Sequence, residues 1–257
     1  MSSLRLRRAY NRVWWAPRLR SVVTGRFFRR DAIDTTHLHA YHEGPGVIGP
    51  VQSEEALVLY GLVRAVRPRT VVEFGFDQGR SAFNFLRALD ADARLYSFDV
   101  RDEAAQLAGA LFGGEERLRF VRKSQAEFEA VDVDGRAVDF VFLDASHDLG
   151  LNQETLRRVL PVLAPGAIVA IHDTGTLSRA TMAPALRAEA DAVRSAQWVT
   201  EDAFEHQPGE RATVNWLRDE HPELAQIHLH THRVVRWGLT LLQRSERLPT
   251  ALDRPAP

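Results

Sequence analysis

Two short polar clusters follow apolar runs in the middle of the chain, and both carry groups that can bind a metal. Residues 144–147 (D-A-S-H) follow the run F-V-F-L, and residues 172–174 (H-D-T) follow the run A-I-V-A-I. Open α/β sheets place their ligands at the carboxyl ends of neighbouring strands, so we expect Asp144, His172 and Asp173 to converge. Two carboxylates and an imidazole suit Mg²⁺, Mn²⁺ or a harder transition metal. The pattern therefore predicts a divalent-metal site at these three residues, with Mg²⁺ as the expected ion.

His147 is the candidate general base of such a site. It lies three residues after Asp144, and a neutral imidazole with an ordinary pKa near ~6.5 can accept a proton at physiological pH. We expect a metal beside Asp144 to lower the pKa of an acceptor hydroxyl, and His147 to remove its proton. Two simpler interpretations stay open at this point: His147 as a loop or helix-capping residue, and Asp144 as an ordinary cap.

A glycine-containing turn follows the first expected strand of the same region. Residues 71–81 read V-V-E-F-G-F-D-Q-G-R-S. Gly75 and Gly79 let the backbone turn tightly and approach a ligand, and a helix beginning near Ser81 would direct its N-terminus at that ligand. The spacing departs from the G-x-G-x-x-G of dinucleotide sites, so we expect a ligand without a pyrophosphate. Glu73, which ends the strand, completes this candidate cofactor-binding group.

Asp99 follows the next expected strand, L-Y-S-F. In doubly wound folds an acid about 20 residues beyond the glycine turn accepts hydrogen bonds from ribose hydroxyls. The alternative is an ordinary aspartate that ends a strand. Together with the glycine turn, Asp99 predicts the binding of a nucleoside.

These residues resemble the motifs of the class I S-adenosylmethionine-dependent methyltransferases. The E-x-G-x-x-x-G-x-S run from Glu73 to Ser81, and Asp99, look like that family's cofactor motifs, and the resemblance covers roughly residues 50–243. Within the family the sequence is most similar to metal-dependent O-methyltransferases of small molecules, of the catechol and macrolide-sugar kinds. The resemblance implies S-adenosylmethionine as cofactor and a hydroxyl as acceptor.

The same resemblance extends to the adenine and metal sites. Relatives often carry a Ser-Gln pair after the third strand, where this chain has R-K-S-Q, which implies that Ser124 and Gln125 hold the adenine. Both could instead cap a short helix around residues 126–128. Metal-dependent relatives carry an acid-acid or Asp-Asn pair at the second cluster, so His172 departs from their pattern.

The elements that must position these groups alternate between strands and helices, which predicts a parallel sheet covered on both faces. Two consecutive strands near the C-terminus leave no room for a crossover helix and should be antiparallel. We therefore expect an α/β, doubly wound, Rossmann-like fold with a seven-stranded, mostly parallel sheet and a C-terminal antiparallel pair. Expected strands are 70–74, 94–98, 118–121, 138–143, 167–171, 226–231 and 235–242; expected helices are 54–67, 81–89, 103–111, 152–163 and 213–219.

Two segments flank the expected methyltransferase domain (51–243), and one insertion lies within it. Residues 1–50 form a basic arm and a glycine- and proline-rich lid, and residues 1–30 contain nine arginines and no acid. The arm suits an interfacial helix on a membrane or an arm on a polyanion. We favour a helix packed on the body or on a second subunit of a homo-oligomer, expected as a dimer. A helical insertion about 176–210 and a flexible tail (244–257) complete the chain. His228, His230 and His232 should share one face of an edge strand.

Composition limits the remaining possibilities. The chain has 257 residues, no cysteine and a net charge of −1, which excludes thiolate chemistry and argues against nucleic acid as a partner. No signal peptide or membrane-spanning run is present, so a cytoplasmic location is the default expectation. The predicted activity is methyl transfer from S-adenosylmethionine to a hydroxyl of a sugar or other small metabolite. The alternatives are a nicotinamide-dependent oxidoreductase and a non-catalytic cofactor-binding module held at a membrane by its arm.

Overall fold

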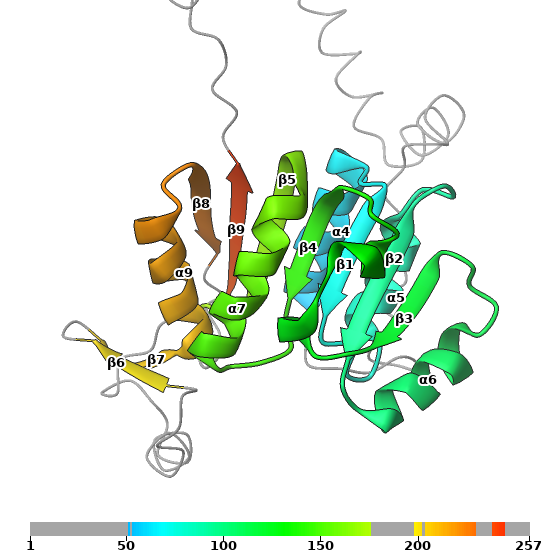
Figure 1. Ribbon diagram of the computed structural model, residues 1–257, viewed down its shortest axis with the longest axis horizontal. Coiled ribbons are helices and arrows are strands. Elements are labelled where there is room, and N and C mark those ends of the chain that lie inside the picture. Colours follow the sequence, from blue (N-terminus) through cyan, green and yellow to red (C-terminus); the bar gives the residue numbers. More distant parts are fainter. Residues whose placement is uncertain (1–50, 52, 176–197, 202–203, 230–237, 245–257) are drawn as a thin grey trace, which may run out of the picture.

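The computed structural model describes residues 51, 53–175, 198–201, 204–229 and 238–244 (Figure 1). The expected basic arm and lid, most of the insertion and the tail lie outside these ranges. No helix within the described ranges is long and apolar enough to cross a membrane.

A seven-stranded sheet forms the centre of the molecule, in the order β3-β2-β1-β4-β5-β9-β8. Only β9 runs against its neighbours: it pairs antiparallel with both β5 and β8, while the other pairs are parallel. This confirms the predicted fold class. The strands are β1 (Thr70–Phe74), β2 (Arg94–Asp99), β3 (Leu118–Arg122), β4 (Val138–Leu143), β5 (Leu163–His172), β8 (Leu224–Leu229) and β9 (Leu239–Arg244).

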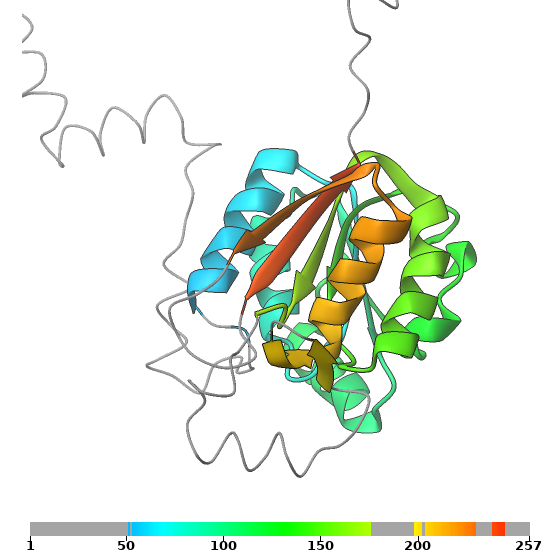
Figure 2. The same ribbon diagram turned by 90° about the vertical axis from the view of Figure 1, so that its left-hand side faces the viewer.

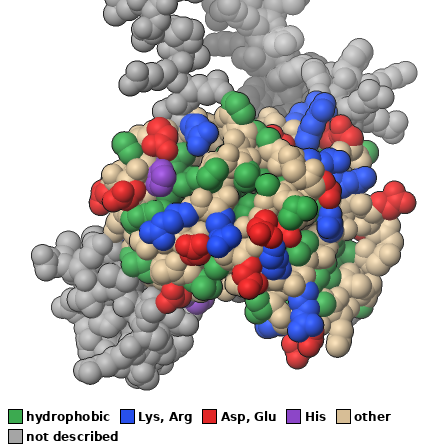
Figure 3. Space-filling model, viewed as in Figure 1, with side chains coloured by type: hydrophobic (Ala, Val, Ile, Leu, Met, Phe, Trp, Pro, Cys, Tyr) green, Lys and Arg blue, Asp and Glu red, His purple; other side chains and the backbone are tan. Residues whose placement is uncertain are grey.

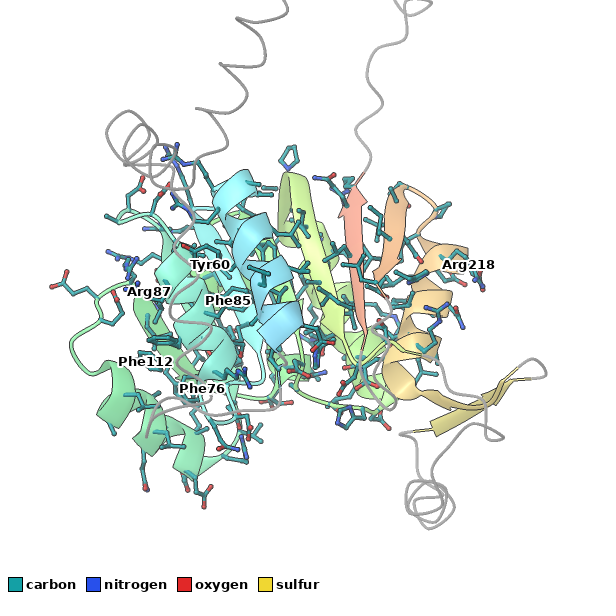
Figure 4. The ribbon with its side chains drawn as sticks, turned by 180° about the vertical axis from the view of Figure 1, so that it is seen from behind. Tyr60, Phe76, Phe85, Arg87, Phe112 and Arg218 are labelled. Carbon is teal, nitrogen blue, oxygen red and sulfur yellow. The ribbon has the colours of Figure 1, made fainter. Side chains whose placement is uncertain are left out.

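Helices cover both faces of this sheet and produce a three-layer molecule (Figure 2). Helices α4, α5 and α6 supply buried side chains to one core, and α7 and α9 supply them to the other. Figure 4 shows the first of these faces, with Tyr60 of α4 and Phe85 of α5 between the helices and the sheet. The helices are α4 (Ser53–Val66), α5 (Arg80–Ala88), α6 (Asp102–Phe112), α7 (Leu149–Val159) and α9 (Gly209–Glu220), with short 3₁₀ turns η2 (Gln125–Glu127), η3 (Ala130–Val133) and η4 (Leu160–Val162).

The central strands are apolar on both faces because each face is covered. In β4, Phe140 and Phe142 belong to the core under α4 and α5, whereas Val141 and Leu143 belong to the core under α7 and α9. Side chains alternate between the faces along a strand, so a continuous apolar run is what a doubly covered sheet requires. Burying each such side chain contributes roughly 1.5–3 kcal/mol.

The prediction of a helical insertion up to about residue 210 was wrong for the part that the structure describes. A separate antiparallel pair, β6 (Trp198–Glu201) and β7 (Phe204–Pro208), precedes α9. The run W-V-T and the following F-E-H are rich in aromatic and β-branched residues, which favour strands. Helix α9 then begins at Gly209 rather than at 213.

Two other boundaries also differ from the sequence prediction. Helix α7 begins at Leu149 instead of 152, because the Asp148 carboxylate caps it by accepting from the Leu151 amide at 2.8 Å. The last strand spans residues 239–244 instead of 235–242. The predicted antiparallel pairing of β8 and β9 is confirmed, and His228 of β8 is exposed and contacts the Thr240 hydroxyl at 2.9 Å. His230 and His232 lie outside the described residues.

Charged side chains of both signs are interspersed on the face shown in Figure 3. Arg119 pairs with Asp134 at 2.7 Å, and Arg158 pairs with Glu154 at 3.0 Å. Exposed pairs of this kind contribute only about 0–1 kcal/mol each. The described part of this face presents mixed charge and no broad basic surface.

Gly75 is required where β1 and β4 end side by side. Its φ is +97°, and a Cβ at this position would lie 2.3 Å from the Asp144 carbonyl oxygen and 2.9 Å from the Ala145 Cα. No side chain fits between these two backbones. The glycine therefore allows the first turn to lie directly against the strand end that carries Asp144.

We predict that Gly75→Ala is much more destabilising than Gly166→Ala. Gly166 also has a positive φ (+74°), but an added Cβ there would meet nothing within 4 Å. Gly166→Ala should cost only the left-handed backbone strain of about 1–2 kcal/mol. Gly75→Ala should cost at least about 2 kcal/mol more, because the clash with β4 adds to that strain. Urea unfolding of both variants measures the difference, and equal losses would contradict the close approach.

Candidate active site

A cavity of about 570 Å³ opens at the carboxyl ends of β1, β2, β4 and β5. In Figure 1 the arrowheads of β1, β2 and β4 point to this edge of the sheet. Its volume falls within the range of small-molecule sites. All of the predicted site residues except Glu73 and Gly79 line it: Gly75, Ser81, Asp99, Ser124, Gln125, Asp144, His147, His172 and Asp173.

Glu73 and Gly79 lie beneath the cavity wall rather than on it. Glu73 is completely buried and accepts a hydrogen bond from the Ser97 hydroxyl. Burial raises the pKa of its carboxyl to about 7, although Ser81 and Ser97 oppose that shift. Gly79 has a φ of +83° and packs against the ring of Phe76, which a Cβ would approach to 2.8 Å. In Figure 4, Phe76 in turn lies beside Phe112 of α6.

Both carboxylate oxygens of Asp99, at the end of β2, accept hydrogen bonds. Its Oδ2 accepts from the Asp77 amide and from Arg101 Nη2, both at 3.0 Å, and its Oδ1 accepts from Arg101 Nε at 3.1 Å. Arg101 Nη2 also contacts Asp77 Oδ1 at 2.9 Å. Burial would raise the pKa of Asp99, but these hydrogen bonds outweigh it and lower the pKa. The lowered pKa favours the ionised form of Asp99, whose oxygens accept hydrogen bonds from the Arg101 guanidinium in this structure.

Gln125 occupies a buried position in the cavity wall, at the start of η2. Its Nε2 donates to Asn152 Oδ1 at 2.8 Å, and among the described residues its buried Oε1 has no hydrogen-bond partner. The neighbouring Ser124 stands at the start of η2, but its side chain makes no capping hydrogen bond. The alternative interpretation of Ser124 as a helix cap thus lacks the contact that it requires.

His172 lies between carboxylates at the end of β5. Its Nε2 contacts Glu55 Oε2 at 2.8 Å, and its Nδ1 contacts Asp144 Oδ1 at 3.0 Å and Asp173 Oδ1 at 3.3 Å. Burial lowers the pKa of His172, but these carboxylates outweigh it and raise the pKa well above the usual value. The carboxylates at both ring nitrogens therefore favour the charged imidazolium form of His172, which would donate from both.

Asp173, His147 and Glu210 form the outer half of the same cluster. Asp173 has a positive φ (57°), a rare backbone conformation that aspartate tolerates better than most residues. His147 Nδ1 lies 4.0 Å from Asp173 Oδ2 and makes a hydrogen bond to Glu210 Oε1. Glu210 is buried, and its Oε2 has no partner within the described ranges. Burial raises the pKa of both Asp173 and Glu210.

The donor set fits a hard divalent cation in part. The ligand atoms of Asp144, His172 and Asp173 lie within 4.8 Å of one another, and so do those of His147, Asp173 and Glu210. Carboxylate oxygens are the ligands that Mg²⁺ and Mn²⁺ prefer, and the partnerless Glu210 oxygen is a further candidate ligand. His172 fits less well, because both of its nitrogens already contact carboxylates.

Four contributors were not identified from the sequence: Glu55, Arg101, Asn152 and Glu210. Glu55 and Glu210 come from helices α4 and α9, which lie far in sequence from the strand ends they meet. No local pattern marks such residues, because only the tertiary fold brings them to the cavity. Arg101 had a weak signal, as a cation two residues after Asp99, the acid predicted to bind a nucleoside.

Comparisons with known proteins find similar sequences and folds. Residues 72–174 match the family model described as a methyltransferase domain. An uncharacterized protein of Sinorhizobium fredii is 30% identical over 126 residues, which cover 44% of this chain and 14% of that protein. The chain thus spans about a seventh of that relative's length.

Solved structures of O-methyltransferases share the fold. The O-methyltransferase TomG of Streptomyces achromogenes, involved in tomaymycin synthesis and solved with S-adenosylmethionine, has a TM-score of 0.53 at 19% identity, covering 82% of this chain and 88% of that one. An O-methyltransferase of Bacillus cereus, solved with S-adenosylhomocysteine, has a TM-score of 0.57 at 16% identity, covering 88% and 96%. Residues 72–174 thus match a methyltransferase domain, and the chain shares the fold of O-methyltransferases solved with S-adenosylmethionine or S-adenosylhomocysteine, in line with the resemblance found in the sequence.

The buried Glu73 predicts a pH-dependent stability. Its pKa rises from 4.5 to about 7 on folding, so the folded state keeps this proton up to a higher pH than the unfolded state does. The resulting stabilisation is complete below pH 4.5 and is lost as the pH rises through 7. Between pH 5 and pH 8 the wild type should lose about 2–3 kcal/mol through this group.

Glu73→Gln should abolish that loss, because an amide keeps hydrogen bonds to the serines without titrating. Urea unfolding at the two pH values provides the measurement, and Glu220→Gln, a change at an exposed residue of α9, serves as the matched control. A wild-type pH dependence that survives in Glu73→Gln would show that another group causes it.

Proposed function

We propose that this protein transfers a methyl group from S-adenosylmethionine to a hydroxyl of a small molecule, with a sugar or similar metabolite as acceptor. One observation carries the proposal. A single cavity brings the nucleoside-binding candidates Gly75, Asp99 and Gln125 together with a cluster of carboxylates and imidazoles at the ends of β4 and β5. The O-methyltransferase relatives support the same reaction.

The cavity residues suit the chemistry of the cofactor. Asp99 offers ionised oxygens for ribose hydroxyls, which would replace the Arg101 donors it now holds. The unpartnered Gln125 Oε1 is an acceptor that suits the amino group of adenine. Gly75 lets the turn after β1 lie directly against the end of β4, so that the turn and Asp144 line the same cavity. When bound, S-adenosylmethionine supplies a methyl group on a positively charged sulfur.

A divalent cation, with Mg²⁺ as first choice, belongs to the proposal. Asp144 and Asp173 are the residues that would hold it, and its chemistry would be to lower the pKa of an acceptor hydroxyl. His172 remains a predicted ligand, but its contacts favour a supporting role, because its two N–H groups orient Asp144, Asp173 and Glu55. A supporting donor of this kind fixes the direction of a ligating carboxylate.

His147 is the proposed general base. Glu210 accepts from its Nδ1–H, which leaves Nε2 as the basic nitrogen of the ring. An imidazole oriented in this way by a carboxylate removes a proton efficiently, because its tautomer and direction are fixed. The burial of Glu210 keeps this contact away from water.

The reaction is tested with the purified full chain in two measurements. Calorimetry should show S-adenosylhomocysteine binding that NADH does not compete for, and labelled S-adenosylmethionine should transfer its methyl group to a member of a panel of hydroxylated sugars and metabolites. His147→Ala should lower kcat by about 10²–10⁴-fold while S-adenosylhomocysteine binding stays unchanged.

His221→Ala, at a histidine beyond the end of α9, is the matched control and should retain full activity. Absence of S-adenosylhomocysteine binding would refute the proposed reaction. Full turnover by His147→Ala would remove His147 as the base and leave the cofactor assignment standing.

The cation is tested separately, by titrating the metal-free protein with Mn²⁺ and following free Mn²⁺ by electron paramagnetic resonance. Asp173→Asn should weaken Mn²⁺ binding by about tenfold or more, since it removes a charged oxygen ligand. Asp219→Asn, at an exposed aspartate of α9, should leave binding unchanged. If the wild type binds no Mn²⁺ at millimolar concentration, or if methyl transfer survives EDTA undiminished, the cation is excluded.

A further inference from the structure

Asn152 of α7 is completely buried and connects the two sides of the cavity. Its Nδ2 donates to the Ser146 carbonyl oxygen at 2.8 Å, and its Oδ1 accepts from Gln125 Nε2 at 2.8 Å. Ser146 lies between the candidate ligand Asp144 and the candidate base His147, whereas Gln125 belongs to the adenine side. One side chain therefore joins the two loops.

The backbone carbonyl determines the orientation of both amides. A carbonyl oxygen can only accept, so the Asn152 amide must direct its NH₂ group at Ser146 and its Oδ1 at Gln125. Asn152 Oδ1 can likewise only accept, so Gln125 must direct its NH₂ group at Asn152. Rotation of either amide by 180° would place two acceptors in contact inside the protein.

This orientation leaves Gln125 Oε1 as a buried acceptor within the wall of the cavity, covered from solvent. Gln125 lines the cavity, and its Oε1 is buried without a partner within the described part of the chain. A buried acceptor without a donor costs about 1–3 kcal/mol. A ligand that presents an N–H group would remove that cost, whereas one that presents an oxygen would add repulsion.

We propose that Asn152 is a positioning residue that sets the base specificity of the cofactor site, by fixing Gln125 so that it accepts from a 6-amino group and rejects a 6-oxo group. The inference rests on the proposed function, since it assumes that a nucleoside binds in this cavity. Asn152 acts through Gln125 and does not itself contact the ligand.

The test compares two ligands by calorimetry on the full chain. S-Adenosylhomocysteine carries the amino group, and S-inosylhomocysteine carries a carbonyl at the same carbon. The wild type should prefer the adenosyl ligand by about 10- to 100-fold. In Asn152→Leu, which has a similar volume but no acceptor, Gln125 can adopt either orientation, and the preference should fall by about tenfold. The two purines also differ at N1. Because the wild type and Asn152→Leu are tested with the same two ligands, that difference cancels when their preferences are compared.

Two further variants separate specificity from general damage. Asn152→Asp retains an oxygen that accepts from Gln125, so it should keep most of the wild-type preference even if stability falls. Asn84→Ala removes another buried asparagine, on α5, whose Nδ2 donates to the Ala56 carbonyl of α4 at 2.9 Å. This variant should prefer the adenosyl ligand by the same factor as the wild type.

Each outcome decides between distinct conclusions. Equal weakening of both ligands in Asn152→Leu, with an unchanged ratio, would show a merely structural residue and overturn the proposal. Loss of the preference in Asn152→Asp as well as in Asn152→Leu would also overturn it, because the accepting oxygen would then not be the determinant. Absence of S-adenosylhomocysteine binding to the wild type would refute the proposed function, and this inference with it.

Discussion

The contact between His172 and Glu55 in the interior of the molecule is the interaction on which the site depends. It joins the end of β5 to helix α4, and the second oxygen of Glu55 accepts from the Gly238 amide at the start of β9 at 3.1 Å. The opposite nitrogen of His172 holds Asp144. Removing one partner from a buried charged pair typically costs about 3–5 kcal/mol. This imidazolium therefore sets where the strand-end carboxylates lie and offsets part of their mutual repulsion.

The cavity divides into two sides with opposite electrostatic character. Around Asp99 the negative charge is balanced by Arg101, and ribose hydroxyls could take the place of the arginine N–H groups as hydrogen-bond donors to the same carboxylate oxygens. Around Asp173 the carboxylates exceed the imidazoles, and Glu210 retains an oxygen without a partner in the described ranges. This excess of carboxyl groups suits a cation, or the positive sulfur of the cofactor, at the β4 and β5 ends. Charge balance thus supports a nucleoside on one side and an activated hydroxyl on the other.

The fold and the strand-end residues could be predicted because their signals are local. Apolar runs alternating with helix periods determine a covered parallel sheet, and the residue that follows each run must lie at its edge, as Asp99, Asp144 and Asp173 do. The insertion could not be predicted in the same way, since composition alone did not separate its β6–β7 pair from a helix. Glu55 and Glu210 reach the site from elements distant in sequence. Their roles depend on tertiary packing and have no motif.

The central claim is that a nucleoside lies between the glycine turn and η2, beside the acid and histidine cluster. A crystal structure of the protein with S-adenosylhomocysteine tests it most directly. The expected result is a ribose whose hydroxyls contact Asp99, with Arg101 displaced, and an adenine amino group within hydrogen-bond distance of Gln125 Oε1. A ligand bound elsewhere, or one bound here with the Arg101–Asp99 contacts intact, would contradict the claim.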